Sequence, residues 1–259
     1  MVHRGVVAAL AGSLLAGGAG AQDVDPARYA PLDPPLRTQQ VSIPQPRDPN
    51  GPGRLTCFFY PDTTVKLLDL NEIGARAISV TPVTAGRPLP PCGKQDDPGE
   101  VLLKEGQGSG FGGMVGGFVH TAYVDGHDGT TFRIYDARSG RLLYTDRTAS
   151  VSGQMERASV AGDVLTLGYT RAVAGPCSIL GGGRACWSQF VREARLPPSV
   201  AASMPGDCAA NYAKGAGGLP GPIGAEDPSY IRYAVTMTLD RSGRAAVLSR
   251  GAASCWPQS

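Results

Sequence analysis

The sequence predicts an all-β protein: a single antiparallel β-sandwich or distorted barrel with long loops, stapled by disulfide bonds. Three observations support this fold class. Short segments rich in aromatic and β-branched residues alternate with turn-forming glycine, aspartate and proline over most of the chain. No window shows an apolar period of about 3.6 residues over a helical length. Six cysteines follow a leader typical of exported proteins, which indicates disulfide bonding.

Residues 1–21 are typical of a signal peptide. A basic start containing Arg4 precedes the apolar run GVVAALAGSLLAGGAG, and Ala19-Gly20-Ala21 has the small-x-small pattern that signal peptidase accepts. The run is shorter than the roughly 20 residues that span a bilayer. No cysteine stands at the predicted mature start, Gln22, for lipidation. We therefore expect a soluble protein in the periplasm or outside the cell.

The charge of the chain excludes two classes of partner. The formal net charge is +2, and removal of the leader deletes one arginine and no acid, which leaves +1. Nucleic acids and anionic lipids attract proteins that carry a basic patch, whereas the charges here are scattered along the chain. We expect no nucleic-acid partner and no membrane span.

Two regions follow the leader. Residues 22–53 are polar and proline-rich, and they predict an arm that lies over the surface or is disordered, because proline removes backbone donors. Residues 54–259 predict a single β-rich domain, long enough for one sizeable core. Predicted strands lie at RLTCFFY, VKLLDL, AISVTPV, FVHTAYV, TTFRIYD, RLLYTDR, DVLTLGYTRAV, ACWSQFVREARL, IRYAVTMTL and RAAVLSR. NEIGARA and SVAASM predict a turn or so of helix, and residues 204–228 predict a long irregular segment.

The segment from Phe118 to Arg147 predicts an antiparallel meander, because the turns DGHDG and ARSG separate three strands. The turns after Asp136 and Asp240, in YDARSGRLLY and TLDRSGRAAVL, share a pattern typical of hairpin corners in β-propeller blades. No further copy falls between them at the roughly 40 to 50 residue spacing of blades. A common turn chemistry therefore explains the pair better than a repeat.

The six cysteines permit several connectivities, and the preferred one joins neighbours in sequence. Cys177 with Cys186 is the firmest pair, because PCSILGGGRAC has the character of a glycine-bearing loop closed at its ends. Cys57 with Cys92, and Cys208 with Cys255, follow by elimination. No C-x-x-C pair is present, so the sequence does not support a zinc ribbon or a thioredoxin-like site.

Residues 57–146 resemble a group of uncharacterised exported bacterial β-rich proteins. The resemblance lies in a cysteine before an aromatic run, then a V-K-x-x-D-L-x-E-x-G-A segment, then a glycine-rich strand that enters a hairpin. The matching residues of the segment are Val65, Lys66, Asp69, Leu70, Glu72, Gly74 and Ala75. The resemblance implies an exported β-rich domain and no particular activity.

The segment GQGSGFGGMVGGF contains G-x-G-x-x-G at Gly108, Gly110 and Gly113. A dinucleotide site requires a helix after this turn, but the following residues are β-branched and broken by glycine. G-x-x-x-G has meaning only inside an apolar membrane span. Ser109 lacks the G-x-S-x-G context of a hydrolase nucleophile. We interpret the glycines as backbone freedom leading into the strand at Phe118, with a possible bulge.

Other candidate residues are weighed as follows. Asp125, His127 and Asp128 are candidate ligands of a metal loop, but a polar hairpin turn explains them better. His120 is expected to be a core or edge histidine rather than a catalytic base. Trp187 and Trp256, beside cysteines, are interpreted as packing against disulfides, with sugar stacking as the minor alternative.

No set of nucleophile, base and oxyanion donors is recognisable, so no catalytic residue and no cofactor are predicted. The leading hypothesis is a non-enzymatic binding or envelope-associated role, with an unknown envelope ligand or protein as partner. The alternative is a small exported hydrolase whose site is assembled from residues distant in sequence, gathering His120 or His127 with Asp125 or Asp128.

Overall fold

The computed structural model describes residues 32–44, 51–70, 76–84, 88–93, 97–104, 109–124, 129–150, 153–215 and 223–258. The predicted signal peptide lies outside these residues. The strands are β1 (Arg37–Ile43), β2 (Gly53–Phe59), β3 (Thr63–Asp69), β4 (Arg76–Pro82), β5 (Val101–Leu102), β6 (Gly110–Val115), β7 (Phe118–Val124), β8 (Thr130–Asp136), β9 (Leu142–Thr148), β10 (Arg157–Ala161), β11 (Val164–Ala174), β12 (Ser229–Asp240), β13 (Ala245–Arg250) and β14 (Ser254–Pro257). The helices are α1 (Ile179–Glu193), α2 (Pro198–Ala201) and α3 (Cys208–Gly215).

Two antiparallel sheets contain all the described strands. One has five strands in the order β1-β2-β3-β4-β5, and the other has nine, in the order β13-β12-β11-β9-β8-β7-β6 with β10 on β11 and β14 on β12. The described strands do not close into a ring, so of the two predicted architectures the sandwich fits. The predicted all-β class and antiparallel pairing are confirmed.

The larger sheet is nearly divided in two. β9 and β11 are joined by the single residue pair Thr148–Arg171, whereas β11 and β12 pair over eleven positions. Each side of this junction is a four-stranded meander, β6–β9 and β10–β13. Strands β1–β4 of the smaller sheet form another four-stranded meander, with its strands in the same order. We call these, in chain order, the first, second and third meanders.

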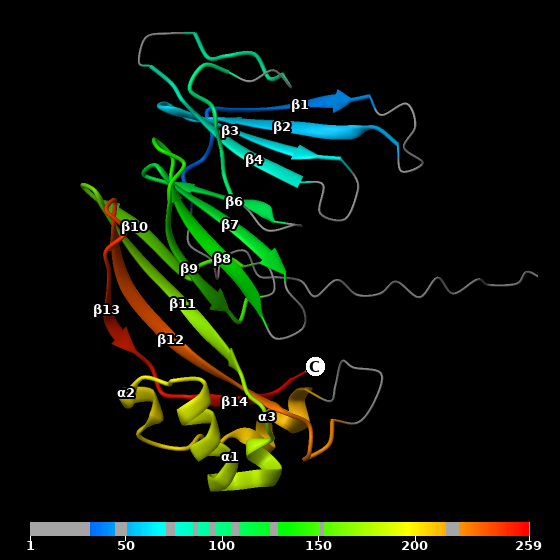
Figure 1. Ribbon diagram of the computed structural model, residues 1–259, viewed down its shortest axis with the longest axis vertical. Coiled ribbons are helices and arrows are strands. Elements are labelled where there is room, and N and C mark those ends of the chain that lie inside the picture. The colour runs from blue at the N-terminus through cyan, green and yellow to red at the C-terminus, as the bar shows by residue number, and fades with distance from the viewer. Residues whose placement is uncertain are drawn as a thin grey trace, which may run out of the picture.

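The three meanders also share their register. The third strand of each one ends at an aspartate: Asp69, Asp136 and Asp240. These aspartates pair with Arg54, Phe118 and Val164, which lie at or next to the start of the second strand. In Figure 1 the meanders follow one another down the long axis of the molecule. They are therefore stacked copies of one supersecondary unit.

Each meander has a front face, turned toward the next meander along the chain, and an opposite back face. The core between the first and second meanders contains Tyr60, Val65, Ile78 and Val80 from the first and Met114, Val119 and Tyr135 from the second. The core between the second and third contains Phe118, Phe132 and Ile134 from the second and Leu165, Leu167, Tyr169, Tyr233, Val235 and Met237 from the third. Alternation along each strand separates the two faces, as the pleat requires.

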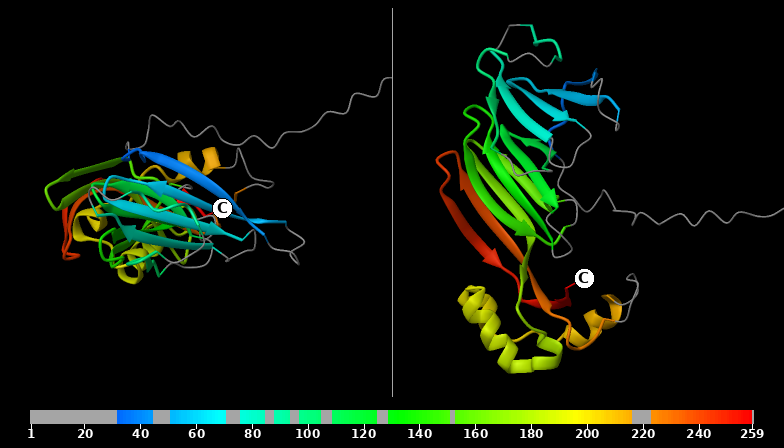
Figure 2. Two further views of the ribbon diagram at one scale, coloured as in Figure 1. Left: turned by 90° about the horizontal axis from the view of Figure 1, so that it is seen from above. Right: turned by 45° about the vertical axis from the view of Figure 1, so that its right-hand side comes forward.

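The three helices lie between β11 and β12 in the chain, at the lower end of the stack in Figure 1 and in the right-hand view of Figure 2. Ser178 caps α1 by accepting a hydrogen bond from the Gly181 N–H at 3.1 Å, and the helix is kinked at Gly183. Ile179 and Phe190 extend the core of the third meander. The predicted strand at ACWSQFVREARL is therefore wrong, and α3 replaces part of the predicted irregular segment 204–228.

The helical insertion explains the wide spacing of the two related turns, which are the same corner of two stacked meanders. Arg241 donates to Asp136 Oδ1 and to Asp163 Oδ1, both at 2.9 Å, and its guanidinium lies 4.4 Å from the Phe118 ring centroid. Arg141 donates back to the carbonyl of Ser242 at 3.0 Å. The structure thus shows a repeat where the sequence analysis inferred only a shared turn.

The glycine-rich segment forms β6 and the turn into β7. The pairing shifts register between Phe111 and Gly113, which is the predicted bulge. Gly116 and Gly117 have φ of 51° and 77°, a conformation that favours glycine. Gly112 lies against the imidazole of His120, where a Cβ would be 2.2 Å from Nδ1. The strand β7 follows this segment, so it lacks the helix that a dinucleotide-binding turn requires.

Residues 37–43, which the sequence placed in the proline-rich arm, form β1 and pair with β2 along its length. The segment RTQQVSI itself contains no proline, so its backbone donors are available to the sheet. The described part of the arm is thus an edge strand of the first meander.

The three disulfides join the pairs that the sequence favoured: Cys57–Cys92, Cys177–Cys186 and Cys208–Cys255. Cys177–Cys186 ties the residue before the α1 cap to the middle of that helix, and Cys208–Cys255 ties α3 to β14. Among the described helices, none is long and apolar enough to cross a membrane.

Candidate functional site

A pocket of about 450 Å³ lies on the back face of the first meander, the end of the stack that no other meander covers. Strands β2, β3 and β4 form its floor, and the segment that leads into β5 forms a wall. The lining residues are Leu55, Lys66, Leu68, Ala77, Ser79, Gly93, Glu100 and Leu102. Leu102 is 64% exposed and stands at the rim.

The wall is held in place by a disulfide and an apolar cluster. Cys57 is fully buried on the back face of β2 and bonds Cys92, next to the lining residue Gly93. Ile43, Leu55 and Phe59 pack with this disulfide in a separate small core. A segment with little regular structure is thereby fixed over the sheet, which gives the pocket a defined shape.

The polar end of the pocket is a lysine shared by two carboxylates. Lys66 Nζ lies 2.9 Å from Asp97 Oδ2 and 2.7 Å from Glu100 Oε2. Ser79 donates to the other oxygen of Glu100, and the Asp97 N–H donates to Glu100 Oε2 at 2.9 Å. The side chains of Lys66, Asp97 and Glu100 are 6%, 18% and 13% exposed. The cluster carries one positive and two negative charges in a poorly hydrated place.

Burial and pairing act in opposite directions on these groups. Burial alone raises the pKa of Glu100, but hydrogen bonds from the Asp97 N–H, Lys66 and Ser79 outweigh it and hold the pKa below its usual value. Burial lowers the pKa of Lys66, and its bonds to Glu100 and Asp97 outweigh that effect and raise it. Near neutral pH the lysine is therefore charged and Glu100 ionised, so neither is poised to exchange a proton.

The sequence analysis did not identify Lys66, Ser79 or Glu100 as site residues. A lysine between Val65 and Leu67 has the alternation of a solvent-facing position, and Glu100 lies 34 residues further along the chain. The available signal was the acidic run DDPGE shortly after Cys92, which a disulfide to Cys57 would bring to the same face.

Ser109 and His120 are the two residues considered for catalysis that the structure describes, and they are not brought together. Ser109 precedes β6 and is buried with no hydrogen-bond partner among the described residues. It continues the side of the strand that carries Phe111, toward the first meander. His120 is 4% exposed on the front face, with its ring 6.0 Å from that of Phe132. Ser109 and His120 therefore lie on opposite faces of the same sheet.

The proposed metal loop, Asp125, His127 and Asp128, lies outside the described residues, as does Gly108. Within the described ranges, no group of three or more His, Cys, Asp or Glu side chains could hold a metal ion. Trp187 packs against Phe190 with ring centroids 6.4 Å apart, and Trp256 stacks on an arginine.

A second buried polar cluster joins the second and third meanders. Asp146 Oδ2 accepts from Tyr169 at 2.5 Å and from Tyr144 at 3.1 Å, and its Oδ1 accepts from Arg171 Nε and the Arg147 N–H at 2.9 Å. Burial and the Asp146 charge raise the pKa of Tyr144 to about 12. The carboxylate is fully occupied, so this cluster acts as a cross-link between meanders and not as a reactive site.

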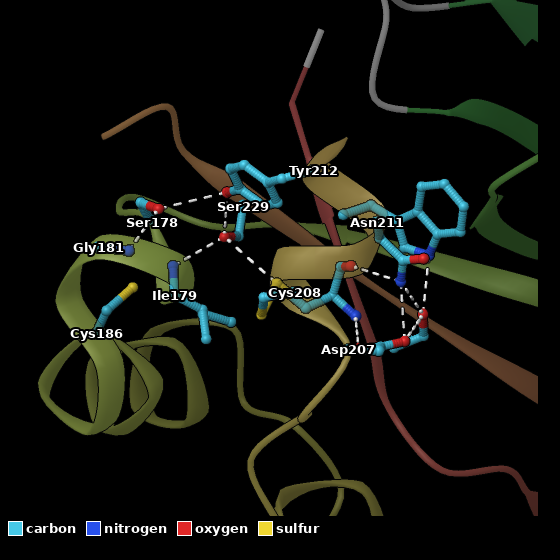
Figure 3. The surroundings of a disulfide bond; sticks show 12 residues. Ser178, Ile179, Gly181, Cys186, Asp207, Cys208, Asn211, Tyr212 and Ser229 are labelled. Atoms are coloured by element: carbon cyan, nitrogen blue, oxygen red, sulfur yellow. Dashed lines mark hydrogen bonds between the residues drawn. A yellow bond between two sulfur atoms is a disulfide. The ribbon is translucent and has the colours of Figure 1, made fainter. Parts of the chain in front are cut away.

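A third polar cluster surrounds Cys208–Cys255 (Figure 3). Tyr212 donates to the Asp227 carbonyl at 2.8 Å, so the 2.6 Å contact with Ser229 uses the serine proton. Asp207 accepts from Ser254, Asn211 and the Cys255 N–H. No histidine or free carboxylate adjoins Ser229 in these bonds, so its hydroxyl is not activated as a nucleophile.

No family model matches the chain, and no curated protein or solved structure is detectably similar to it. The inferred relation to exported bacterial proteins stays a prediction.

Proposed function

We propose that the protein is an exported binding domain that holds an apolar or amphipathic small ligand in the pocket of the first meander and performs no reaction on it. The pocket carries this proposal. Leucine side chains provide apolar walls, Leu102 stands at an open rim, and a disulfide fixes the covering wall. Concave, mainly apolar sites with a few polar groups are typical of small-molecule binding.

The polar end favours particular ligand chemistry. Asp97 and Glu100 together exceed the charge of Lys66 by one negative charge, so the end of the pocket attracts hydrogen-bond donors or a cationic head. The driving force for binding would come mainly from burial of Leu68, which is partly exposed, and Leu102, which is exposed. Three disulfides and the predicted signal peptide support export to an oxidising compartment.

Binding can be tested with the uncharged fluorophore N-phenyl-1-naphthylamine and mature protein. We expect saturable fluorescence enhancement with one site per chain. Ala77→Phe, which fills the pocket, should abolish it, and Leu102→Asp at the rim should weaken it. The matched control is Ala234→Phe on the exposed front face of the third meander, which should bind as the wild type does. Equal binding by the wild type and both pocket variants, each shown to be folded by circular dichroism, would refute the pocket.

The hydrolase alternative would gather His120 or His127 with Asp125 or Asp128, and of these four residues only His120 lies in the described part of the chain. Ser109, the serine considered as a nucleophile, lies on the opposite side of the second meander from His120. It remains testable with p-nitrophenyl esters of different chain lengths. We expect no turnover above background. Hydrolysis that co-purifies with the protein and disappears in His120→Ala would overturn the non-enzymatic assignment.

A further inference from the structure

Arg232 has an unusual setting on the front face of the third meander. Tyr230 lies two residues before it on β12, and Trp256 on β14 is the direct partner of Tyr230. The guanidinium carbon is 4.5 Å from the Tyr230 ring centroid and 4.3 Å from that of Trp256. Two aromatic rings therefore contact the cation within cation–π distance.

Within the described part of the chain, no acidic side chain pairs with this arginine. Arg241 and Arg171, the other part-buried arginines described above, each pair with a carboxylate. The Arg232 side chain makes no ion pair or hydrogen bond with any described residue, and its Nε is buried without a partner. Burial lowers the pKa of Arg232 to about 10, with no opposing contribution. A guanidinium in this state has lost hydration and gained no anion in return.

Asp207, which is linked to Arg232 through Ser254, already binds other groups. Ser254, the cross-strand partner of Arg232, donates to Asp207 at 2.7 Å and accepts from Trp256 Nε1 at 2.8 Å. Asp207 also binds Asn211 and the Cys255 N–H, and these bonds outweigh burial and lower its pKa. Asp207 is thus directed toward α3 and β14. The Gln258 amide likewise donates to the carbonyls of Gly175 and Ser229.

We propose that Arg232, with Tyr230 and Trp256, forms a binding site for an oxyanion, the carboxylate or phosphate group of a ligand. The N–H donors of a guanidinium point outward in its plane, and a planar fork matches two oxygens of such a group. The two rings lie against the guanidinium carbon, and an anion would bind the N–H donors at its outer edge. The neighbouring Ala234 is exposed and small, which leaves room beside the cation. This site is separate from the pocket of the first meander.

The test uses the indole N–H resonances of the protein, because the chain has only two tryptophans and Trp256 adjoins the site. The Trp256 signal is assigned with Trp256→Phe. Sodium phosphate and sodium acetate are titrated separately at constant ionic strength set by chloride. We expect a saturable shift of the Trp256 signal with at least one anion, while the Trp187 signal stays in place. A response to only one of them identifies whether phosphate or carboxylate is preferred.

Three variants decide the outcome. Arg232→Gln should abolish the shift, and Arg232→Lys, which keeps the charge but loses the fork, should weaken binding about tenfold, the equivalent of one lost charged hydrogen bond. Arg54→Gln, at an exposed position of the first meander, should bind as the wild type does. A thermal melt verifies that each variant is folded. The proposal is overturned by a shift that persists in Arg232→Gln, or by no saturable shift with either anion.

Discussion

The front faces of the second and third meanders occupy equivalent positions and differ in chemistry. Four and two residues before the terminal aspartate, the second meander has Phe132 and Ile134, which are buried. The third meander has Thr236 and Thr238 at these positions, and both are partly exposed. The backbone is the same unit, and the difference is that a neighbour packs on one face and not on the other.

This difference shows how a stack of meanders is ended. Repeat proteins need terminal units with polar outer faces, because an apolar face left open would attract further copies. The third meander ends the stack by substituting threonine for core residues. The first ends it in another way, by covering its back face with a disulfide-tethered wall, and the covered end is where the pocket lies.

The largest loss of stability is expected when a core side chain is removed from the front face of the second meander. Phe132→Ala removes a fully buried ring that contacts Tyr169 across the two meanders, and should cost about 3–5 kcal/mol of unfolding free energy. Thr236→Ala, at the matched position of the open face, should change stability by less than about 0.5 kcal/mol. Urea denaturation measures both. Similar losses for the two variants would contradict the assignment of one face as core and the other as an end.

The next effect concerns the covered end. Replacing Cys57 and Cys92 together by alanine should lower stability by roughly 2–4 kcal/mol, because the bond constrains the unfolded chain. The same double variant should bind N-phenyl-1-naphthylamine weakly, since the wall is released. Thermal melts and the fluorescence titration report the two consequences. Retention of full binding in a destabilised protein would show that the disulfide does not shape the pocket.

A smaller loss is expected at the first strand of the second meander. Gly112→Val would drive its Cβ into the His120 ring, and overpacking of this kind costs about 1–3 kcal/mol. The matched control is Ser159→Val in β10, the first strand of the third meander. Ser159 is exposed and pairs with Thr166, and Thr166 occupies the position in the third meander that His120 occupies in the second. Chemical denaturation should show a loss for the first variant only. Folding should suffer before any binding activity does.

Acid should weaken the covered end selectively. The pKa of Glu100 is lowered in the folded state, so its stabilising contribution is present above the unfolded pKa near 4.5 and is lost as the pH falls through the folded value. The pH dependence of the unfolding free energy between pH 6 and 3 measures this. Glu100→Gln should flatten the curve relative to the wild type. An unchanged slope would mean that the Lys66 cluster adds nothing to stability.

The smallest effect on stability is expected for Thr238→Ile, which should instead change the self-association of the protein. Thr238→Ile makes the open face resemble the inner face at Ile134, and should alter unfolding free energy by less than about 0.5 kcal/mol. We expect it to promote self-association, because added apolar surface on the open front face favours contact between the front faces of two molecules. Sedimentation velocity at several concentrations tests this. A strictly monomeric variant would argue that the threonines are not needed to end the stack.

Local patterns predicted much of the fold. The strands from Phe118 to Arg147 were predicted because alternation and turn residues agree there, and the disulfide pairs followed from sequence proximity. Helix α1 was missed, since three adjacent glycines and the run CWSQFV favour a loop and a strand. Its helical state depends on the Ser178 cap, the Cys177–Cys186 bond and packing of Phe190, of which the last is a tertiary contact.

Long-range features were out of reach for the sequence. The repeat was hidden because the insertion between β11 and β12 separates Asp240 from the rest of its meander. The pocket was hidden because Lys66 and Glu100 meet only after β3, β4 and the tethered wall are assembled. Nothing in the sequence indicated a site at Arg232, because the lack of an acidic partner can be recognised only when the residues around it are known.

The Arg241 junction has a consequence for engineering. It binds the turns of the second and third meanders together at one end of the strands, through Asp136 and Asp163. At the opposite end, the connection between β11 and β12 contains the three helices. The equivalent connection of the second meander, between β7 and β8, is short. The scaffold thus has a clamped edge and a permissive edge. Foreign sequences grafted between β7 and β8 would leave the clamped edge intact.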